Sequence, residues 1–213
     1  MKLMLSSSGI DNASLQNALR NLVKEEIKIA FIPTAANIKV GNKDWLIKDL
    51  NNCAKVRQVD IVDISALEKD KWLPRLELAN VIFMGGGDSA YLMSWIVKSG
   101  LIDELPRLLK NRIYVGISAG SIVLSKNLSA SRAFIYGDGK KAEILGLGYV
   151  DFYVRPHLNS SHFPNDRDEI LKKLASKFDS DLYAIDDNSA IIYDNGKLKV
   201  ISEGKWIKYP HNQ

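Results

Sequence analysis

Short apolar runs alternate with amphipathic segments along the first half of the chain. Four short, mainly apolar runs predict strands, at residues 2–6, 28–32, 59–64 and 81–84. Between them, apolar side chains recur at helical spacing at residues 12–23, 44–54 and 66–78, with a break expected near Pro74. Strands that are apolar on both faces and alternate with helices indicate a parallel sheet covered by helices on both sides.

The second half continues this alternation and ends in a hairpin. Segments 90–98, 102–110 and 165–178 are predicted helices, and apolar residues at 113–115, 152–154 and 182–185 predict strands. Asn195-Gly196 separates the apolar runs 190–193 and 198–202, which predicts a type I′ hairpin, and a last strand is expected at 205–209. We therefore expect one domain, residues 1–213, folded as a three-layer α/β sandwich with a mostly parallel central sheet and a C-terminal β-hairpin.

Segment 125–143 does not fit the alternation. It is rich in serine, glycine and charged residues and has no clear period. Connections of this length are uncommon in compact domains unless they have a function. We therefore expect a lid or a rim there.

Composition narrows the class of protein. With 46% hydrophobic and 25% charged residues, the chain resembles an ordinary soluble protein, and no apolar segment is long enough to span a membrane or to act as a signal peptide. The net charge of +4 comes from scattered Lys and Arg residues without a nucleic-acid-binding motif, so no nucleic-acid partner is expected. The single cysteine, Cys53, excludes an internal disulfide and suits the inner side of a helix. We expect a cytoplasmic monomer or homodimer.

The strongest chemical signal is a serine at a sharp turn. The apolar run 113–115 leads into Gly116-Ile117-Ser118-Ala119-Gly120, and an apolar helical pattern follows. Glycines two positions before and after the serine allow strand and helix to approach closely. This is the G-x-S-x-G pattern of a nucleophile elbow in its strand–turn–helix context. The alternative is that Ser118 only caps a helix.

A second glycine turn follows the preceding strand. Gly85-Gly86-Gly87 comes directly after the run 81–84 and leaves backbone amides exposed at the end of that strand. Because parallel strands carry ligands at their carboxyl ends, we expect the amides of Gly87 and Ala119 to form an oxyanion hole beside Ser118. The plainer interpretation is a tight connection with Asp88 as helix cap, and both can hold together.

Three histidines are candidates for a base that serves Ser118. His157 follows a predicted strand, and Pro156 keeps the preceding backbone out of a helix. His162 lies in a polar loop, and His211 is close to the carboxyl terminus. We expect His157 to be the base, the alternative being a structural histidine. With no further His or Cys nearby, a metal site at His157 and His162 is not expected, and neither is a cofactor.

A serine–histidine pair needs a third group that orients the imidazole. Asp186 and Asp187 close the predicted strand 182–185, where at least one of them forms a turn. Asp187 is favoured as the orienting acid, and Asp186 remains the alternative.

Together these motifs resemble those of the peptidase E family. The order Ser118, His157, Asp187 differs from that of the α/β-hydrolases, and Gly-Gly-Gly-Asp, Gly-Ile-Ser-Ala-Gly-Ser, Arg-Pro-His and Ala-Ile-Asp-Asp occur in the order found in that family. The resemblance covers nearly the whole chain. It implies the class I glutamine amidotransferase-like, flavodoxin-like fold and serine peptidase activity, with aspartyl dipeptidases and cyanophycinases as relatives.

Position by position, the resemblance makes Ser118 the nucleophile, His157 the base, and the Gly87 and Ala119 amides the oxyanion donors. Asp187 stands where the aspartyl dipeptidases carry a glutamate, and Asp88 where they carry an asparagine. Arg167 matches an arginine associated with recognition of the substrate's aspartate side chain.

The resemblance therefore implies a serine peptidase that hydrolyses short peptides, as a dipeptidase with a preference for an N-terminal aspartate. Asp88 could bind the free α-ammonium of such a substrate. A glutamine amidotransferase would need a cysteine at position 118. The remaining alternative is a small-ligand-binding or regulatory protein that keeps the pocket without turnover.

Overall fold

The computed structural model describes residues 1–137 and 143–211, and its core is a seven-stranded sheet. The strand order is β3-β2-β4-β5-β1-β8-β9. The strands are β1 (Lys2–Ser6), β2 (Ile29–Ile32), β3 (Val59–Ile61), β4 (Val81–Met84), β5 (Ile113–Ile117), β8 (Ser189–Asp194) and β9 (Lys197–Ser202). The first five in this order run parallel, and β8 and β9 form the antiparallel hairpin at one end. The expected α/β class and mostly parallel sheet are confirmed.

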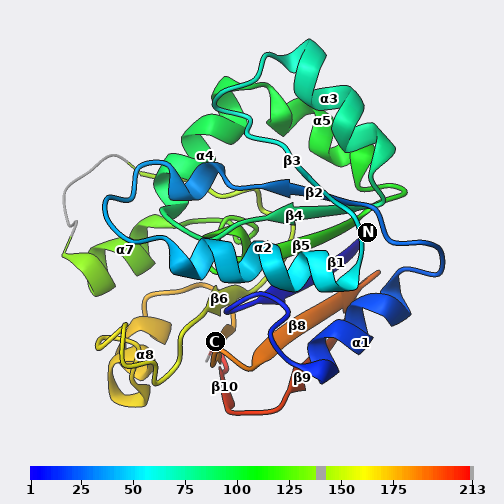
Figure 1. The fold of residues 1–213 in the computed structure, drawn as a ribbon. Helices are drawn as coiled ribbons and strands as arrows, with labels where there is room; N and C mark the ends of the chain where they lie inside the picture. The colour runs from blue at the N-terminus through cyan, green and yellow to red at the C-terminus, as the bar shows by residue number, and fades with distance from the viewer. Residues whose placement is uncertain (138–142, 212–213) are drawn as a thin grey trace.

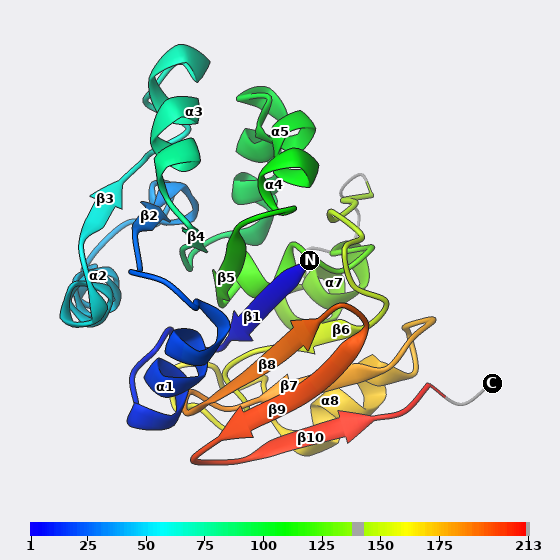
Figure 2. The same cartoon turned by 90° about the vertical axis from the view of Figure 1, so that its right-hand side faces the viewer.

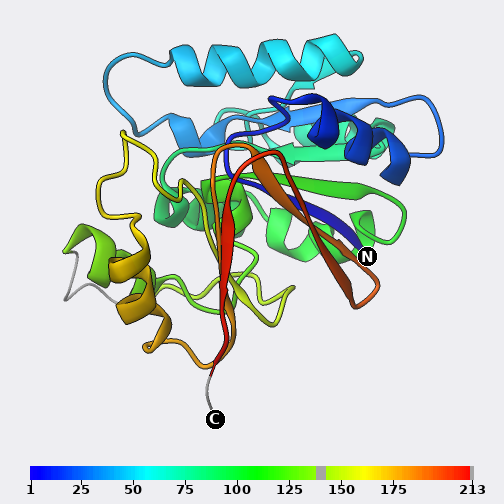
Figure 3. The same ribbon diagram turned by 90° about the horizontal axis from the view of Figure 1, so that it is seen from below.

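Helices cover both faces of this sheet (Figures 1 and 3). On one face, α1 (Ala13–Leu22) and α2 (Asp44–Val56) pack on the sheet through a cluster that includes Leu15 and Cys53. On the other, α3 (Lys69–Leu78), α4 (Ser89–Lys98) and α5 (Leu101–Leu108) bury residues such as Trp72 and Leu92. The central strands β2, β4 and β5 are buried along their whole length and apolar on both sides, because helices shield both faces of the sheet there.

Three further strands form a second sheet that the sequence pattern did not separate from the first. Its order is β10-β7-β6, from β6 (Tyr153–Arg155), β7 (Leu182–Ile185) and β10 (Trp206–Tyr209). Strands β6 and β7 are parallel, and β10 is antiparallel to β7. Helix α8 (Asp168–Ala175) covers one face through Leu171 and Leu174. Figure 2 shows this sheet and α8 beside the β8–β9 end of the large sheet.

Two local expectations were wrong. Helix α3 continues through Pro74 instead of breaking there. Segment 125–143 is not without regular structure, because α7 occupies Ser129–Tyr136; residues 138–142 of the expected lid lie outside the described residues. Within the described ranges, no helix is long and apolar enough to cross a membrane.

The parallel strands place their carboxyl ends along one edge of the large sheet. Ser7 follows β1, Gly85-Gly86-Gly87 follows β4, and Ser118 follows β5, which leads into the short helix α6 (Ala119–Ile122). In the second sheet, the pairing of Arg155 with Ala184 brings the ends of β6 and β7 together. The residues that follow these two strands therefore lie close to each other.

Candidate active site

Ser118 lies at the expected sharp turn between β5 and α6. Its backbone has φ 49° and ψ −105°, a conformation that is costly for a residue with a side chain and is concentrated at functional sites. The flanking glycines are required by close approach. A Cβ on Gly116 would lie 2.6 Å from the Gly120 carbonyl oxygen, and one on Gly120 would lie 2.1 Å from that of Met84. The turn therefore holds the half-buried Ser118 hydroxyl in one place at the sheet edge.

Ser6, the last residue of β1, holds this turn in place through its carbonyl oxygen. The Ser118 amide donates to the Ser6 carbonyl oxygen at 3.0 Å, and the Ser121 hydroxyl donates to the same oxygen at 2.8 Å. These bonds connect the elbow to the strand beside it.

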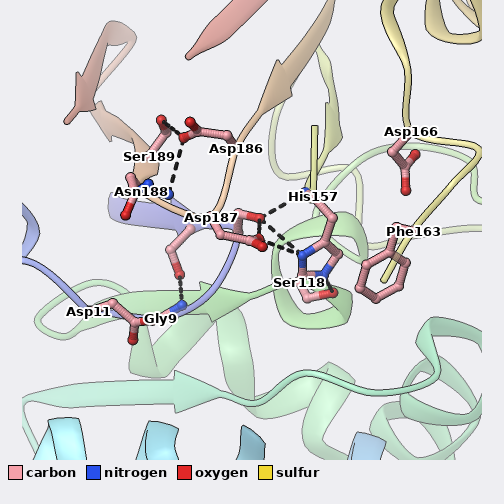
Figure 4. Close-up of polar contacts among 12 residues, drawn as sticks. Gly9, Asp11, Ser118, His157, Phe163, Asp166, Asp186, Asp187, Asn188 and Ser189 are labelled. Carbon is pink, nitrogen blue, oxygen red and sulfur yellow. Dashed lines mark hydrogen bonds and ion pairs between the residues drawn. The ribbon is translucent and has the colours of Figure 1, made fainter. Parts of the chain in front are cut away.

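His157 reaches Ser118 from the second sheet. Its Nε2 lies 2.9 Å from Ser118 Oγ. The residue follows β6 in a left-handed conformation, with φ 65°, and its imidazole stacks on the Phe163 ring with centroids 4.0 Å apart and planes 3° from parallel. Figure 4 shows the Phe163 ring beside the imidazole. Only 13% of the His157 side chain is exposed, so the ring has little freedom to leave this position.

Asp187 contacts the other nitrogen of the same ring. Its Oδ1 lies 2.6 Å from His157 Nδ1 (Figure 4). Partial burial opposes the charged form, but hydrogen bonds from His157, Ser7 and Ser160 outweigh it and hold the pKa of Asp187 below its ordinary value. An ionised carboxylate only accepts hydrogen bonds, so Nδ1 is the donor, and in the neutral form of the ring Nε2 then offers its lone pair to the Ser118 hydroxyl.

The neighbouring Asp186 forms a turn instead. Its carboxylate accepts hydrogen bonds from the Ser189 hydroxyl, the Asn188 amide and the Lys205 amide, at 2.5, 3.1 and 2.6 Å. Figure 4 shows it directed toward Ser189, away from His157. Of the two aspartates, Asp187 is the one that contacts the imidazole.

Gly86 lies next to Ser118, and Gly87 follows it in the chain. A Cβ added to Gly86 would lie 3.5 Å from the Ser118 Cβ. Gly87 has φ 139°, and a Cβ there would lie 2.1 Å from the Ala35 carbonyl oxygen, so only glycine fits. Within residues 1–137 and 143–211, neither the Gly87 nor the Ala119 amide donates a hydrogen bond to another residue, which leaves both N–H groups able to bind a ligand.

Asp88 already has partners in this structure. It caps α4 by accepting from the Tyr91 amide at 2.9 Å, and Arg132 of α7 lies 3.3 Å from both of its oxygens. Burial raises the pKa of this carboxyl, but the Tyr91 amide and the Arg132 and Lys39 cations outweigh burial and lower it. Asp88 is therefore a charged helix cap paired with α7.

Arg167 lies in the loop that follows His157. Its guanidinium donates to the carbonyl oxygen of Phe163 at 3.1 Å. The ring of this same Phe163 stacks on His157. A buried pair anchors the loop, because Arg155 donates to both oxygens of Asp166, at 2.5 and 3.0 Å. Within the described ranges, no three His, Cys, Asp or Glu side chains gather closely enough to hold a metal ion.

Three residues outside the sequence motifs also contact the expected site. Ser7 bonds Asp187 and His157, Phe163 stacks on His157, and Arg132 pairs with Asp88. Of these, only Ser7 carried a signal, since it lies in a polar break directly after a strand and at the same sheet edge as Ser118.

Comparison with known proteins gives one family. The model of peptidase family S51 matches residues 3–201. An uncharacterized peptidase of Pasteurella multocida is 26% identical over 206 residues, which cover 94% of this chain and 96% of the relative. Peptidase E of Streptomyces coelicolor is 28% identical over 158 residues, covering 71% of this chain and 62% of the relative.

Solved structures share the fold. A proposed peptidase E protein from Listeria monocytogenes EGD-e superposes with a TM-score of 0.79 at 19% identity, over 95% of this chain and 98% of the other. A peptidase from an acI-B1 Actinobacterium gives a TM-score of 0.72 at 21% identity, over 100% and 95%. At these identities the likeness supports a common fold.

Proposed function

The chain belongs to peptidase family S51 and is a serine peptidase, and from this premise we propose that Ser118, His157 and Asp187 cleave short peptides through an acyl-enzyme. The observation that carries the proposal is the continuous set of contacts from Ser118 Oγ to His157 Nε2 and from His157 Nδ1 to Asp187 Oδ1. An alcohol, an imidazole and a carboxylate in this order are the groups of a serine nucleophile with its base and orienting acid.

In the first step, Ser118 Oγ attacks the carbonyl carbon of the scissile peptide bond. His157 Nε2 takes the hydroxyl proton, so no free alkoxide forms. The positive charge that develops on the imidazole faces Asp187, whose lowered pKa keeps it ionised. The carboxylate therefore stabilises the imidazolium and holds its Nδ1–H in place without taking the proton.

The carbonyl oxygen gains negative charge as the tetrahedral intermediate forms. We propose that the amides of Gly87 and Ala119 donate to this oxyanion. Gly87 directly follows Gly86, which borders the Ser118 side chain, and Ala119 is the residue after the nucleophile. Removing one oxyanion donor in other serine peptidases costs about 10²- to 10³-fold in kcat, so these amides would carry a large part of the rate.

The intermediate then collapses. The carbon–nitrogen bond breaks, and the imidazolium gives its proton to the leaving amine. The same base next activates a water molecule, whose oxygen attacks the ester carbon, and Ser118 recovers its proton when the acid product leaves.

We further propose dipeptides that begin with aspartate as preferred substrates. Arg167 supports this preference, because its guanidinium donates to the carbonyl oxygen of Phe163, whose ring stacks on His157, and a cation in this loop could pair with a substrate carboxylate. Asp88 is the proposed partner of the substrate's α-ammonium, although it would share its charge with Arg132 and the α4 cap. Replacing Arg167 by glutamine should therefore reduce kcat/KM for Asp-Leu more than for Asn-Leu.

Ser118→Ala tests the chemistry. A fluorophosphonate probe should label the wild-type protein at Ser118, and a dipeptide and aminoacyl-anilide panel should show turnover that the variant lacks. Replacement of a nucleophilic serine is expected to lower kcat by about 10⁶-fold. Hydrolysis that persists in Ser118→Ala would contradict the mechanism. A wild-type protein that is neither labelled nor active would favour a binding protein on the same fold.

A further inference from the structure

Ser7 is a buried serine that contacts two members of the proposed triad. It follows β1, and its residue exposure is 0%. Its hydroxyl lies 2.7 Å from Asp187 Oδ1, accepts the His157 amide at 2.8 Å, and lies 3.3 Å from His157 Nδ1. Its neighbours are the residues that prepare the base.

Counting donors fixes the direction of these bonds. A serine hydroxyl has one proton, and the ionised carboxylate of Asp187 can only accept, so the Ser7 proton points at Asp187. One oxygen lone pair then accepts the His157 backbone N–H. With both its proton and this lone pair engaged, the Ser7 hydroxyl has one preferred orientation, and it fixes the position of both residues.

The His157 backbone needs such support. A left-handed conformation is unfavourable at a residue other than glycine and persists only when its surroundings hold it. Ser7 accepts the amide hydrogen of this very residue. The same hydroxyl thus holds the base through its main chain and the acid through its side chain.

The position of Ser7 in the fold explains why its contacts affect both halves of the site. The Ser6 carbonyl oxygen binds the Ser118 amide, while the next residue, Ser7, binds His157 and Asp187. Ser118 follows a strand of the large sheet, and His157 and Asp187 follow strands of the second sheet. Two consecutive residues at the end of β1 therefore connect the two halves of the site.

We infer that Ser7 is a positioning residue of the proposed triad, which keeps the Asp187 carboxylate and the His157 imidazole in register with Ser118. This inference rests on the proposed function. The hydroxyl does not reach the substrate in this assignment; it acts through Asp187 and His157.

Ser7→Ala tests it against Ser8→Ala, a matched control in the same turn whose side chain makes no hydrogen bond to another described residue. We expect Ser7→Ala to lower kcat about 10- to 100-fold with KM within twofold, because a hydrogen bond to a charged group is lost and the base is free to misalign. The acid limb of the pH–rate profile should move to lower pH, since an Asp187 carboxylate that is no longer held against Nδ1 stabilises the protonated imidazole less. An unchanged kcat, or a lower kcat with an unmoved acid limb, would overturn the inference.

A second measurement does not depend on turnover. In the wild-type protein the proton between His157 Nδ1 and Asp187 should give a low-field proton NMR signal, which Ser8→Ala retains. In Ser7→Ala this signal should broaden or shift toward higher field, because the pair is no longer held at one distance. If the signal is the same in both variants, Ser7 does not position the pair, whether or not peptides are hydrolysed. If the signal changes while the wild-type protein cleaves no peptide and takes no fluorophosphonate, the proposed function fails and the positioning stands.

Discussion

Asp186 and Asp187 are adjacent in the chain but have different neighbours. Asp187 contacts the imidazole of His157, whereas Asp186 accepts three hydrogen bonds from the turn that leads to β8 and from Lys205. The two residues therefore offer a matched pair of variants, in which the same chemical change is made one position apart.

We expect Asp187→Asn to lower kcat by roughly 10³- to 10⁴-fold, because an amide in place of the carboxylate favours the wrong imidazole tautomer and cannot stabilise its cation. Asp186→Asn should keep most of kcat and instead lower the free energy of unfolding by about 1 kcal/mol, since a half-buried acceptor of three hydrogen bonds in the turn is altered. Steady-state kinetics and urea unfolding of both variants check this. The reverse pattern would make Asp186 the orienting acid.

The residues of the site divide into those that sequence patterns indicate and those that only the fold reveals. Ser118 lies between glycines that allow strand and helix to approach closely, so a local pattern indicates it. His157 and Asp187 each follow an apolar run. Ser7 and Phe163 gain their partners across sequence separations of 150 and 6 residues, and nothing in their own neighbourhood specifies those partners. Contacts of this kind depend on which strand ends meet, which periodicity does not encode.

At the scale of elements, the spacing of apolar residues predicted most strands and helices. It did not predict which strands belong to which of the two sheets. The runs that became β6 and β7 look like those of the central sheet, because both kinds of strand are buried on two faces. Helix α3 shows a second limit of prediction from the sequence pattern. Pro74 removes one backbone hydrogen bond to the carbonyl of Asp70, but that residue is exposed, so water can satisfy the carbonyl and the helix continues.

Helix α2 carries a buried carboxyl on the face that packs against the loop after β1. Asp49 is 5% exposed, and burial, followed by repulsion from Asp11, raises its pKa to about 7, against the attraction of Lys48. A Cβ on Gly9 would lie 3.1 Å from its Oδ1, so the carboxyl has little room to reach water. In the folded protein Asp49 therefore keeps its proton up to about pH 7, whereas in the unfolded chain it loses the proton near pH 4.

This difference predicts how stability depends on pH. Because the pKa is raised in the folded state, the contribution of Asp49 is fully present below about pH 4 and is lost as pH rises through about 7. Asp49→Asn should remove the loss and make the protein more stable than the wild type at pH 8.5, by up to about 4 kcal/mol, with little difference at pH 4. Urea unfolding at several pH values measures this. Asp44→Asn, on an exposed position of the same helix, is the control, and equal gains in both variants would contradict the argument.

At the scale of the molecule, the two sheets share one core. Val154, Tyr183 and Ile185 of the second sheet belong to the same buried cluster as Leu3 and Leu5 of the large sheet. The proposed active site spans the same junction, with its nucleophile on one side and its base and acid on the other. The geometry of the site therefore depends on the two sheets remaining packed together.

We accordingly propose that the chain is one domain and unfolds in a single transition. Separation of the second sheet alone would expose apolar residues of the shared cluster, which opposes a populated intermediate.

Two of the four tryptophans report on the two parts, because Trp72 is buried in α3 and Trp206 lies on β10. Variants that keep only Trp72 or only Trp206 should give the same urea midpoint by fluorescence, matching that of far-ultraviolet circular dichroism, and the calorimetric enthalpy should be about 150 kcal/mol near 60 °C. An earlier midpoint for Trp206 would mean that the second sheet unfolds by itself, and activity should then be lost with that first transition, because His157 and Asp187 would leave Ser118.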